Sequence, residues 1–144
     1  MIGFGEIRRL AAQWQLDITD VEQIYATDWL IDGIFHQPEL LTRSILRGAS
    51  ALRHAHLPDY PPTETIELTA RDPLDPSILR DALADAARIA AAASQIRFEL
   101  ADLDRGGAKF EYTGPLGRRS AAQPRIMLAI VFGPTRLPPA RSAL

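Results

Sequence analysis

Two short segments contain residue types that can handle an anionic ligand and a metal ion. Gly48-Ala49-Ser50 is a turn of small residues before a predicted helix, where backbone N–H groups can point at phosphate oxygens. The segment Thr63–Thr69 alternates polar and apolar residues as a strand does, which places Thr65 and Glu67 on one face. A carboxylate on such a strand can bind a divalent cation. This order of turn and strand is typical of phosphate-handling sites, but this face of the strand has one carboxylate where such a site usually needs two.

The bulk composition indicates one soluble domain. The chain has 144 residues, which is enough for one hydrophobic core and too few for two, so we expect a single domain over residues 1–144. The formal net charge is -2, so no broad basic field indicates a nucleic acid or a membrane surface, although a local basic patch stays open. The chain has no cysteine, which excludes disulfides and thiolate metal sites. No signal peptide or membrane-spanning run is recognised, so we expect a cytoplasmic location.

Hydrophobic periodicity predicts helices first and then strands interleaved with one long helix. Helices are expected over Phe4–Gln15, from a capping box of Thr19 and Glu22 to about Phe35, over Glu39–Arg43, over Ala49–His56, and from Asp75-Pro76 to about Ser94. Strands are expected over Ser44–Arg47, Glu64–Ala70, Gln95–Leu103, Ala108–Thr113 and Arg125–Phe132. The last strand is nearly all apolar, which predicts a central strand covered on both faces. The sequence therefore predicts an α+β (mixed α/β) domain, and residues 133–144 are expected to form an extended tail.

An ordered set of weak motifs covers most of the chain. A helix contains Glu22-Gln23-Ile24-Tyr25, and Gly48-Ala49-Ser50-Ala51-Leu52 follows a strand. Next come Thr63-Glu64-Thr65-Ile66-Glu67 on a strand, the loop Gly114-Pro115-Leu116-Gly117 after an aromatic strand, and Met127-Leu128-Ala129-Ile130 on the last strand. In this order and at these spacings, the region from about Val21 to Phe132 resembles the nucleotidyltransferases of the AbiEii/AbiGii type, the toxin component of type IV toxin–antitoxin systems.

This resemblance implies a small mixed sheet flanked by helices and the transfer of a nucleoside monophosphate from a nucleoside triphosphate onto RNA or protein. In that family three carboxylates on two adjacent strands hold a pair of magnesium ions. Magnesium prefers hard oxygen ligands at short, near-octahedral distances. The family's glycine-rich turn offers backbone N–H groups to the phosphates.

When the family's motifs are matched to this sequence residue by residue, the nucleotide-binding turn is better preserved than the metal ligands. Gly48 and Ser50 match the nucleotide-binding turn, and Ala49 replaces its second glycine. Thr65 and Ala129 stand at the positions of two lost carboxylates, and Glu67 is the only remaining acidic ligand. The family also continues into a helical half after the last strand, whereas this chain stops shortly after Phe132.

Three hypotheses follow for the function. The first is a truncated, degenerate nucleotidyltransferase domain without a cofactor, which acts as a scaffold or binds a protein. That partner would be an antitoxin or a chain that supplies the missing helical half. The second is an active toxin that uses magnesium with a nucleoside triphosphate, with Glu67 and misaligned acids such as Glu64, Asp72 or Asp59 as ligands. The third is a nucleotide sensor that binds through Gly48 and Ser50 without turnover. A nucleic-acid partner stays open, and a membrane partner is not expected.

Overall fold

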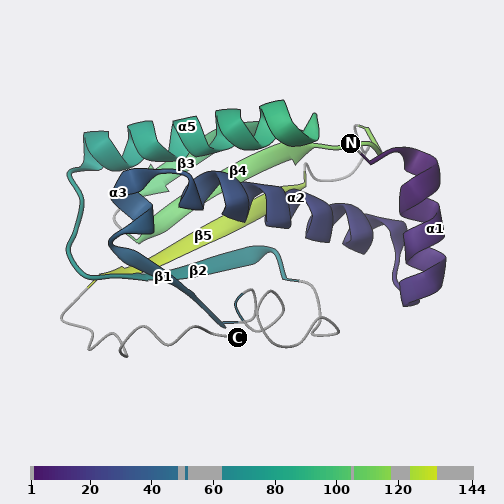
Figure 1. Cartoon of the computed structure of the whole chain (residues 1–144), viewed down its shortest axis with the longest axis horizontal. Coiled ribbons are helices and arrows are strands. Elements are labelled where there is room, and N and C mark those ends of the chain that lie inside the picture. The colour runs from purple at the N-terminus through teal and green to yellow at the C-terminus, as the bar shows by residue number, and fades with distance from the viewer. Residues whose placement is uncertain (1, 49–50, 52–62, 105, 118–123, 133–144) are drawn as a thin grey trace.

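The architecture is a single mixed sheet with helices packed on it. The structure is a computed structural model that describes residues 2–48, 51, 63–104, 106–117 and 124–132. Its helices are α1 (Phe4–Trp14), α2 (Ile18–Phe35), α3 (Pro38–Leu41) and α5 (Pro76–Ser94), and its strands are β1 (Ser44–Arg47), β2 (Thr65–Ala70), β3 (Arg97–Asp104), β4 (Gly107–Thr113) and β5 (Arg125–Phe132). Helices α2 and α5 lie side by side over the sheet, and α1 lies across one end (Figure 1). The predicted α+β fold is therefore confirmed.

The described strands form one five-stranded sheet in the order β1-β2-β5-β4-β3. Strands β2 and β5 are parallel, whereas β1 with β2, β4 with β5, and β3 with β4 pair antiparallel. The last of the described strands thus lies at the centre of the sheet. It joins the β1–β2 pair to the β3–β4 hairpin.

The side chains of the central strands alternate between a buried face and an open face. On β2, Ile66, Leu68 and Ala70 are buried, as the sequence predicts. On β5, Ile126, Leu128 and Ile130 are buried in the same layer, but Val131 is 48% exposed. The prediction of a doubly covered last strand is therefore wrong: β5 is central in the sheet, but only one of its faces is buried in the core.

The main core lies between α2, α5 and the buried face of the sheet. Its largest side chains are fully buried, and they come from both layers: Leu30, Ile34, Ile66, Leu68, Leu83, Phe110, Tyr112, Ile126 and Leu128. Helix α5 begins as predicted, because Asp75 caps it and Pro76 follows at the first helical position. The backbone N–H of Ser77 donates to Asp75 Oδ1 at 2.9 Å. The long alanine-rich helix therefore packs closely on both α2 and the sheet.

The start of α2 differs from the prediction of a capping box. The helix begins at Ile18 with Asp17 as its N-cap residue, and no side chain makes a capping hydrogen bond there. Glu22 instead is fully buried, and its Oε2 accepts a hydrogen bond from the backbone N–H of Leu116 at 2.7 Å. A contact with a residue 94 positions away thus replaces the local contact that the sequence pattern indicates.

Other boundaries differ by a few residues. The short helix begins at Pro38, which occupies the first helical turn. Gln95 ends α5 in the left-handed conformation, so β3 begins at Arg97 and not at Gln95. The predicted helix over residues 49–56 lies outside the described residues apart from Ala51, and the predicted tail 133–144 lies outside them completely.

Helix α1 is attached through a small second cluster. Ile7 and Ala11 pack against Val21 of α2, and partly buried apolar residues surround them: Ile2, Leu10, Leu16 and Leu116. The backbone N–H of Ile2 also donates to the hydroxyl of Tyr25 at 3.2 Å. Because Leu116 belongs to the loop after β4, α1 contacts both α2 and this loop.

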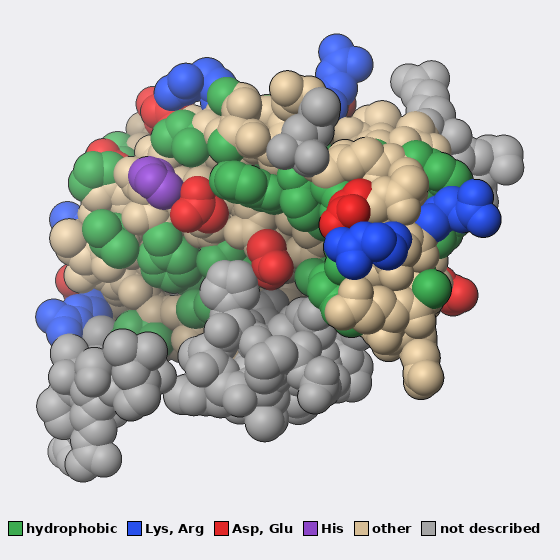
Figure 2. All heavy atoms as spheres, turned by 45° about the vertical axis from the view of Figure 1, so that its right-hand side comes forward, with side chains coloured by type: hydrophobic (Ala, Val, Ile, Leu, Met, Phe, Trp, Pro, Cys, Tyr) green, Lys and Arg blue, Asp and Glu red, His purple; other side chains and the backbone are tan. Residues whose placement is uncertain are grey.

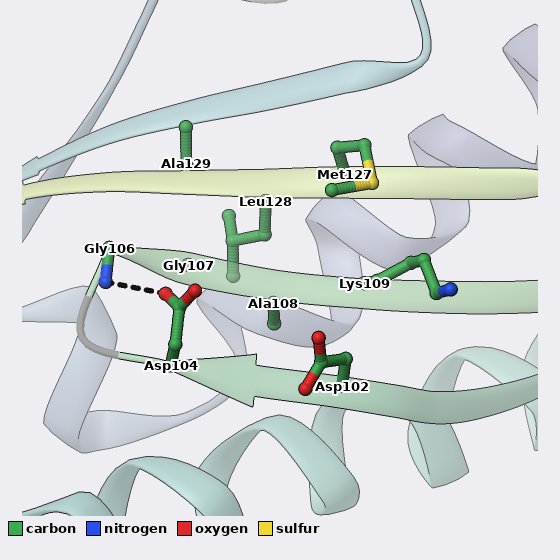
Figure 3. Close-up of a pocket in the computed structure, with 9 residues that line it drawn as sticks. All are labelled: Asp102, Asp104, Gly106, Gly107, Ala108, Lys109, Met127, Leu128 and Ala129. Atoms are coloured by element: carbon green, nitrogen blue, oxygen red, sulfur yellow. Dashed lines mark hydrogen bonds between the residues drawn. The ribbon is translucent and has the colours of Figure 1, made fainter.

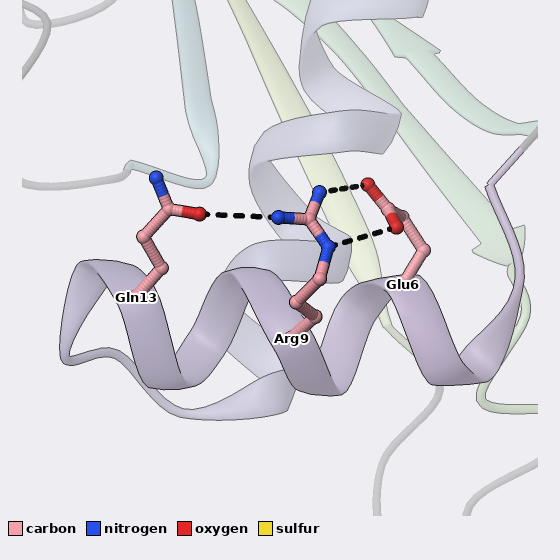
Figure 4. Close-up of polar contacts among 3 residues, drawn as sticks. All are labelled: Glu6, Arg9 and Gln13. Carbon is pink, nitrogen blue, oxygen red and sulfur yellow. Dashed lines mark hydrogen bonds and ion pairs between the residues drawn. The ribbon is translucent and has the colours of Figure 1, made fainter.

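The outer surface of α1 has an ion pair that makes a testable prediction. Arg9 donates to the carboxylate of Glu6 and to Oε1 of Gln13, the second contact being 3.3 Å long (Figure 4). The hydrogen bond from Arg9 lowers the pKa of Glu6 below the usual value for a glutamate. The contribution of Glu6 to stability is therefore complete above its unfolded pKa and is lost as pH falls through its folded pKa.

We expect an NMR titration of the Glu6 carboxyl to give a lowered pKa in the native chain. In Arg9→Gln the titration midpoint of Glu6 should rise, because the donated hydrogen bond is removed. Arg8→Gln removes the neighbouring exposed arginine instead, so it serves as the control and should leave the Glu6 midpoint at its native value. Equal Glu6 midpoints in the native chain and in Arg9→Gln would contradict the ion pair.

Candidate functional site

The predicted metal-ligand positions meet on the open face of the sheet. Strands β2 and β5 are adjacent and parallel, and their register pairs Glu67 with Ala129 and Thr65 with Met127. Thr65, Glu67 and Ala129 are all half-buried, in contrast to their fully buried neighbours Ile66, Leu68 and Leu128. The three positions that the resemblance assigns to carboxylates therefore lie together.

The predicted turn contacts the same carboxylate. Strand β1 pairs antiparallel with β2 so that Arg47 lies opposite Glu67, and Gly48 follows directly. Gly48 has a φ of +71°, and a Cβ placed there would lie 1.4 Å from Oε2 of Glu67. The left-handed conformation favours glycine, and the absence of a Cβ leaves the space that the Glu67 carboxylate occupies. The structure thus brings Gly48 and Glu67 together, whereas Ala49 and Ser50 lie outside the described residues.

The alternative acids of the second hypothesis do not gather around Glu67 in the described part of the chain. Glu64 lies 3.8 Å from the guanidinium of Arg125, and Asp72 is exposed beyond the opposite end of β2. Asp59 lies outside the described residues. Within the described ranges no group of three or more His, Cys, Asp or Glu side chains is placed to hold a metal ion. Glu67 is therefore the one carboxylate that the described residues place at this position.

A hollow on the open face continues from Ala129 toward the β3–β4 hairpin. It has a volume of about 300 Å³, and nine residues line it: Asp102, Asp104, Gly106, Gly107, Ala108, Lys109, Met127, Leu128 and Ala129 (Figure 3). Sequence reasoning missed its two aspartates. Their signal was the alternation of Asp102-Leu103-Asp104, but the predicted strand ended at Leu103, and strand order was needed to place both aspartates beside Ala129.

The cross-strand register fixes how far these acids lie from Glu67. Glu67, Ala129, Gly107 and Asp104 follow one another across the strands β2, β5, β4 and β3. Three strand spacings separate Glu67 from Asp104, which places their backbones about 14 Å apart. The paired metal ions of phosphoryl-transfer sites lie only about 4 Å apart. Asp104 is thus too distant to replace the missing ligands beside Glu67.

The charged residues of the hollow have partners of their own. Asp104 Oδ1 accepts the backbone N–H of Gly106 at 2.7 Å, and Asp102 Oδ1 accepts that of Leu103 at 2.9 Å. Lys109 lies opposite Asp102, and its Nζ is 3.9 Å from Oε1 of Glu111 on its own strand. These groups are therefore held by the hairpin itself.

Two motif segments of the resemblance contact each other away from the open face. Glu22 receives the N–H of Leu116, and the neighbouring Gln23 Oε1 accepts the hydroxyl proton of Tyr112 at 2.7 Å. A Cβ at Gly114 would lie 2.8 Å from the Glu22 carboxyl group, which shows how closely the loop approaches it. These residues join α2 to the end of β4. Their role is to hold the loop and helix together.

A comparison of the chain with models of protein families, with curated proteins and with solved structures finds no match. Among the described residues, no helix is both long enough and apolar enough to cross a bilayer.

Proposed function

We propose that this chain is a degenerate nucleotidyltransferase-fold domain of the AbiEii/AbiGii type that acts by binding another protein. The observation that carries the proposal is the cross-strand pair of Glu67 and Ala129, with Gly48 against the same carboxylate. This is the arrangement of turn and adjacent strands that the resemblance implies. Its side chains, however, lack the negative charge that the chemistry requires, because Thr65 and Ala129 stand where the resemblance implies carboxylates.

The donor set at this position does not fit a pair of magnesium ions. Glu67 supplies one negative charge, Thr65 supplies a neutral hydroxyl, and Ala129 supplies a methyl group. Magnesium in such sites depends on carboxylate oxygens, and losses of mere supporting partners typically weaken metal affinity by about 10–100-fold. Glu67 also leans toward Gly48 on the β1 side, away from Ala129. The proposal therefore assigns no catalytic step to this face.

Exposed apolar side chains beside Glu67 support a role in binding. Ile45 and Val131 both lie opposite Thr69, on either side of it, and they are 40% and 48% exposed. Large apolar side chains grouped on an open sheet face favour contact with another protein. On the face of the molecule that Figure 2 shows, the Lys and Arg side chains of the described residues are scattered and form no continuous basic patch.

Restoring the missing carboxylates tests the structural part of the proposal. In Thr65→Asp/Ala129→Asp, three acidic groups would share the face around Glu67, and we expect Mn²⁺ and Mg²⁺ affinity to rise at least tenfold over the native chain. Calorimetric titration measures this. Ala84→Asp/Ala92→Asp adds the same charge on the exposed surface of α5 and should leave metal affinity unchanged.

The native chain itself provides the opposing outcome. If it binds magnesium and a nucleoside triphosphate tightly, or transfers labelled nucleotide to RNA or protein in a way that Glu67→Gln abolishes, it is an active enzyme and the proposal is wrong.

The binding role is tested by co-purification with proteins encoded by adjacent genes. Ile45→Glu/Val131→Glu should release such a partner, whereas Ile78→Glu, at an equally exposed position on α5, should retain it.

A further inference from the structure

Helix α2 carries aromatic side chains that its own core buries only in part. Leu30 and Ile34 of this helix are fully buried between α5 and the sheet, whereas Tyr25 and Trp29 are half-buried and pack only at the edge of the main core. The rings of Tyr25 and Trp29 meet edge to face, with their centroids 6.3 Å apart and an angle of 72° between the ring planes. The outward surface of a helix in a globular domain is ordinarily polar. These two rings therefore keep contact area that the fold itself does not use.

Two carboxylates lie on the same side of α2 as the two rings. Asp28 and Asp32 follow Tyr25 by about one and two helical turns, which aligns all three along the helix. Asp28 is half-buried, whereas the side chain of Asp32 is 51% exposed and its Oδ2 lies 3.5 Å from Nδ1 of His36. We call Tyr25, Asp28, Trp29 and Asp32 the outer stripe of α2. The stripe combines aromatic surface with negative charge.

The negative charge is concentrated in the segment that contains this stripe. Residues 16–42 include no lysine or arginine and six acidic residues: Asp17, Asp20, Glu22, Asp28, Asp32 and Glu39. Because the chain has 18 acidic and 16 basic residues in all, the rest of it carries 12 acidic against 16 basic residues. The neighbouring helix α5 has two aspartates and two arginines, and Nε of Arg88 lies 3.6 Å from Oδ1 of Asp85. The charge bias thus belongs to α2 and not to the whole helical layer.

We propose that the outer stripe of α2 docks an arginine-rich helix of another protein. Guanidinium groups both pair with carboxylates and stack on aromatic rings, and arginines one turn apart on a partner helix match the spacing of Asp28 and Asp32. The same negative charge repels nucleic-acid phosphates and anionic membrane surfaces. The stripe is about 10 Å long from Tyr25 to Asp32, which exceeds the size of a single small cation. It lies on the helical layer, so the inference is independent of the open sheet face and of the function proposed for it.

Titration of the ¹⁵N-labelled full chain with a capped polyalanine helix that has arginine at every fourth position tests the stripe. We expect saturable shifts of the Tyr25 and Asp32 amides and of the indole N–H of Trp29. The same peptide with glutamine in place of arginine should bind at least tenfold more weakly, because the charge-assisted contacts are lost. Spermine should also bind at least tenfold more weakly, because it has no helix to match the stripe. No saturable shifts, or equal affinity for either control compound, would overturn the proposal.

Matched variants separate this stripe from general electrostatics. Asp28→Asn/Asp32→Asn should weaken binding of the arginine peptide about tenfold, and Asp32→Asn alone, at an exposed position, about threefold, in line with the modest strength of exposed ion pairs. Trp29→Leu keeps an apolar side chain but removes the ring, and should cost about threefold. Asp81→Asn/Asp85→Asn removes two exposed carboxylates at the same spacing from α5 and should leave affinity unchanged. Equal losses in the two double variants, or no loss in Asp32→Asn and Trp29→Leu, would contradict a specific docking surface.

Discussion

Replacing Glu22 with alanine is expected to lower the free energy of unfolding by about 3 kcal/mol, because it removes a buried acceptor and leaves a cavity. Glu22 is fully buried, and the N–H of Leu116 would lose its 2.7 Å acceptor. The loop that contains Leu116 also helps to bury Ile7 and Ala11 of α1. Loosening of this loop should therefore also loosen the attachment of α1.

Urea denaturation monitored by circular dichroism measures this loss. Glu22→Gln retains the carbonyl acceptor and nearly the same volume, so it should lose less stability than Glu22→Ala. Glu39→Ala removes an exposed glutamate from α3 and should change stability by less than about 0.5 kcal/mol. A loss in Glu22→Ala as small as in Glu39→Ala would show that the buried contact does not hold the loop.

Replacing Gly33 with alanine is expected to destabilise the fold by about 2 kcal/mol through overpacking. Gly33 lies where α2 crosses α5, and a Cβ there would lie 2.4 Å from the backbone carbonyl oxygen of Ala86. A backbone atom inside a helix cannot move aside as the end of a flexible side chain can. The two helices would have to separate, and the alanine contacts between them would be lost.

The same substitution at Gly5 provides the control with the opposite sign. Gly5 lies in α1, and nothing is within 4 Å of the Cβ that it would gain. Gly5→Ala should therefore stabilise the chain by about 0.5–1 kcal/mol through helix propensity alone. Thermal and urea denaturation of both variants would compare them directly. Stabilisation in both would mean that α2 and α5 are less closely packed than the structure indicates.

The sequence predicted best those features that depend on neighbouring residues. Asp75-Pro76 at a helix start and the alternation of Ile66, Leu68 and Ala70 are local signals, and both are confirmed. The capping box of Thr19 and Glu22 was also a local signal, but burial of Glu22 against Leu116 overrode it. A contact over 94 residues cannot be recognised from the pattern of one helix.

The resemblance predicted which residues of the candidate site lie together, but the sequence did not predict the cavities beside them. The resemblance placed Gly48, Glu67 and Ala129 together, and the register of β1, β2 and β5 agrees with that placement. The hollow beside Ala129 depends on β4 lying next to β5. A second groove, which Leu74, Leu79 and Leu103 line, depends on the end of β3 lying beside the first turns of α5. Strand order decides both, and single-strand periodicity contains no information about strand order.

The position of β5 has a consequence for synthesis of the chain. Strand β5 follows all the other described strands in the sequence and lies between β2 and β4, so both of these strands lack a neighbour until it arrives. During synthesis, the edges of β2 and β4 that pair with β5 would therefore stay exposed until β5 has left the ribosome. The sheet therefore cannot be completed before β5 is available, and a nascent chain that stalls before Arg125 would expose both edges to chaperones.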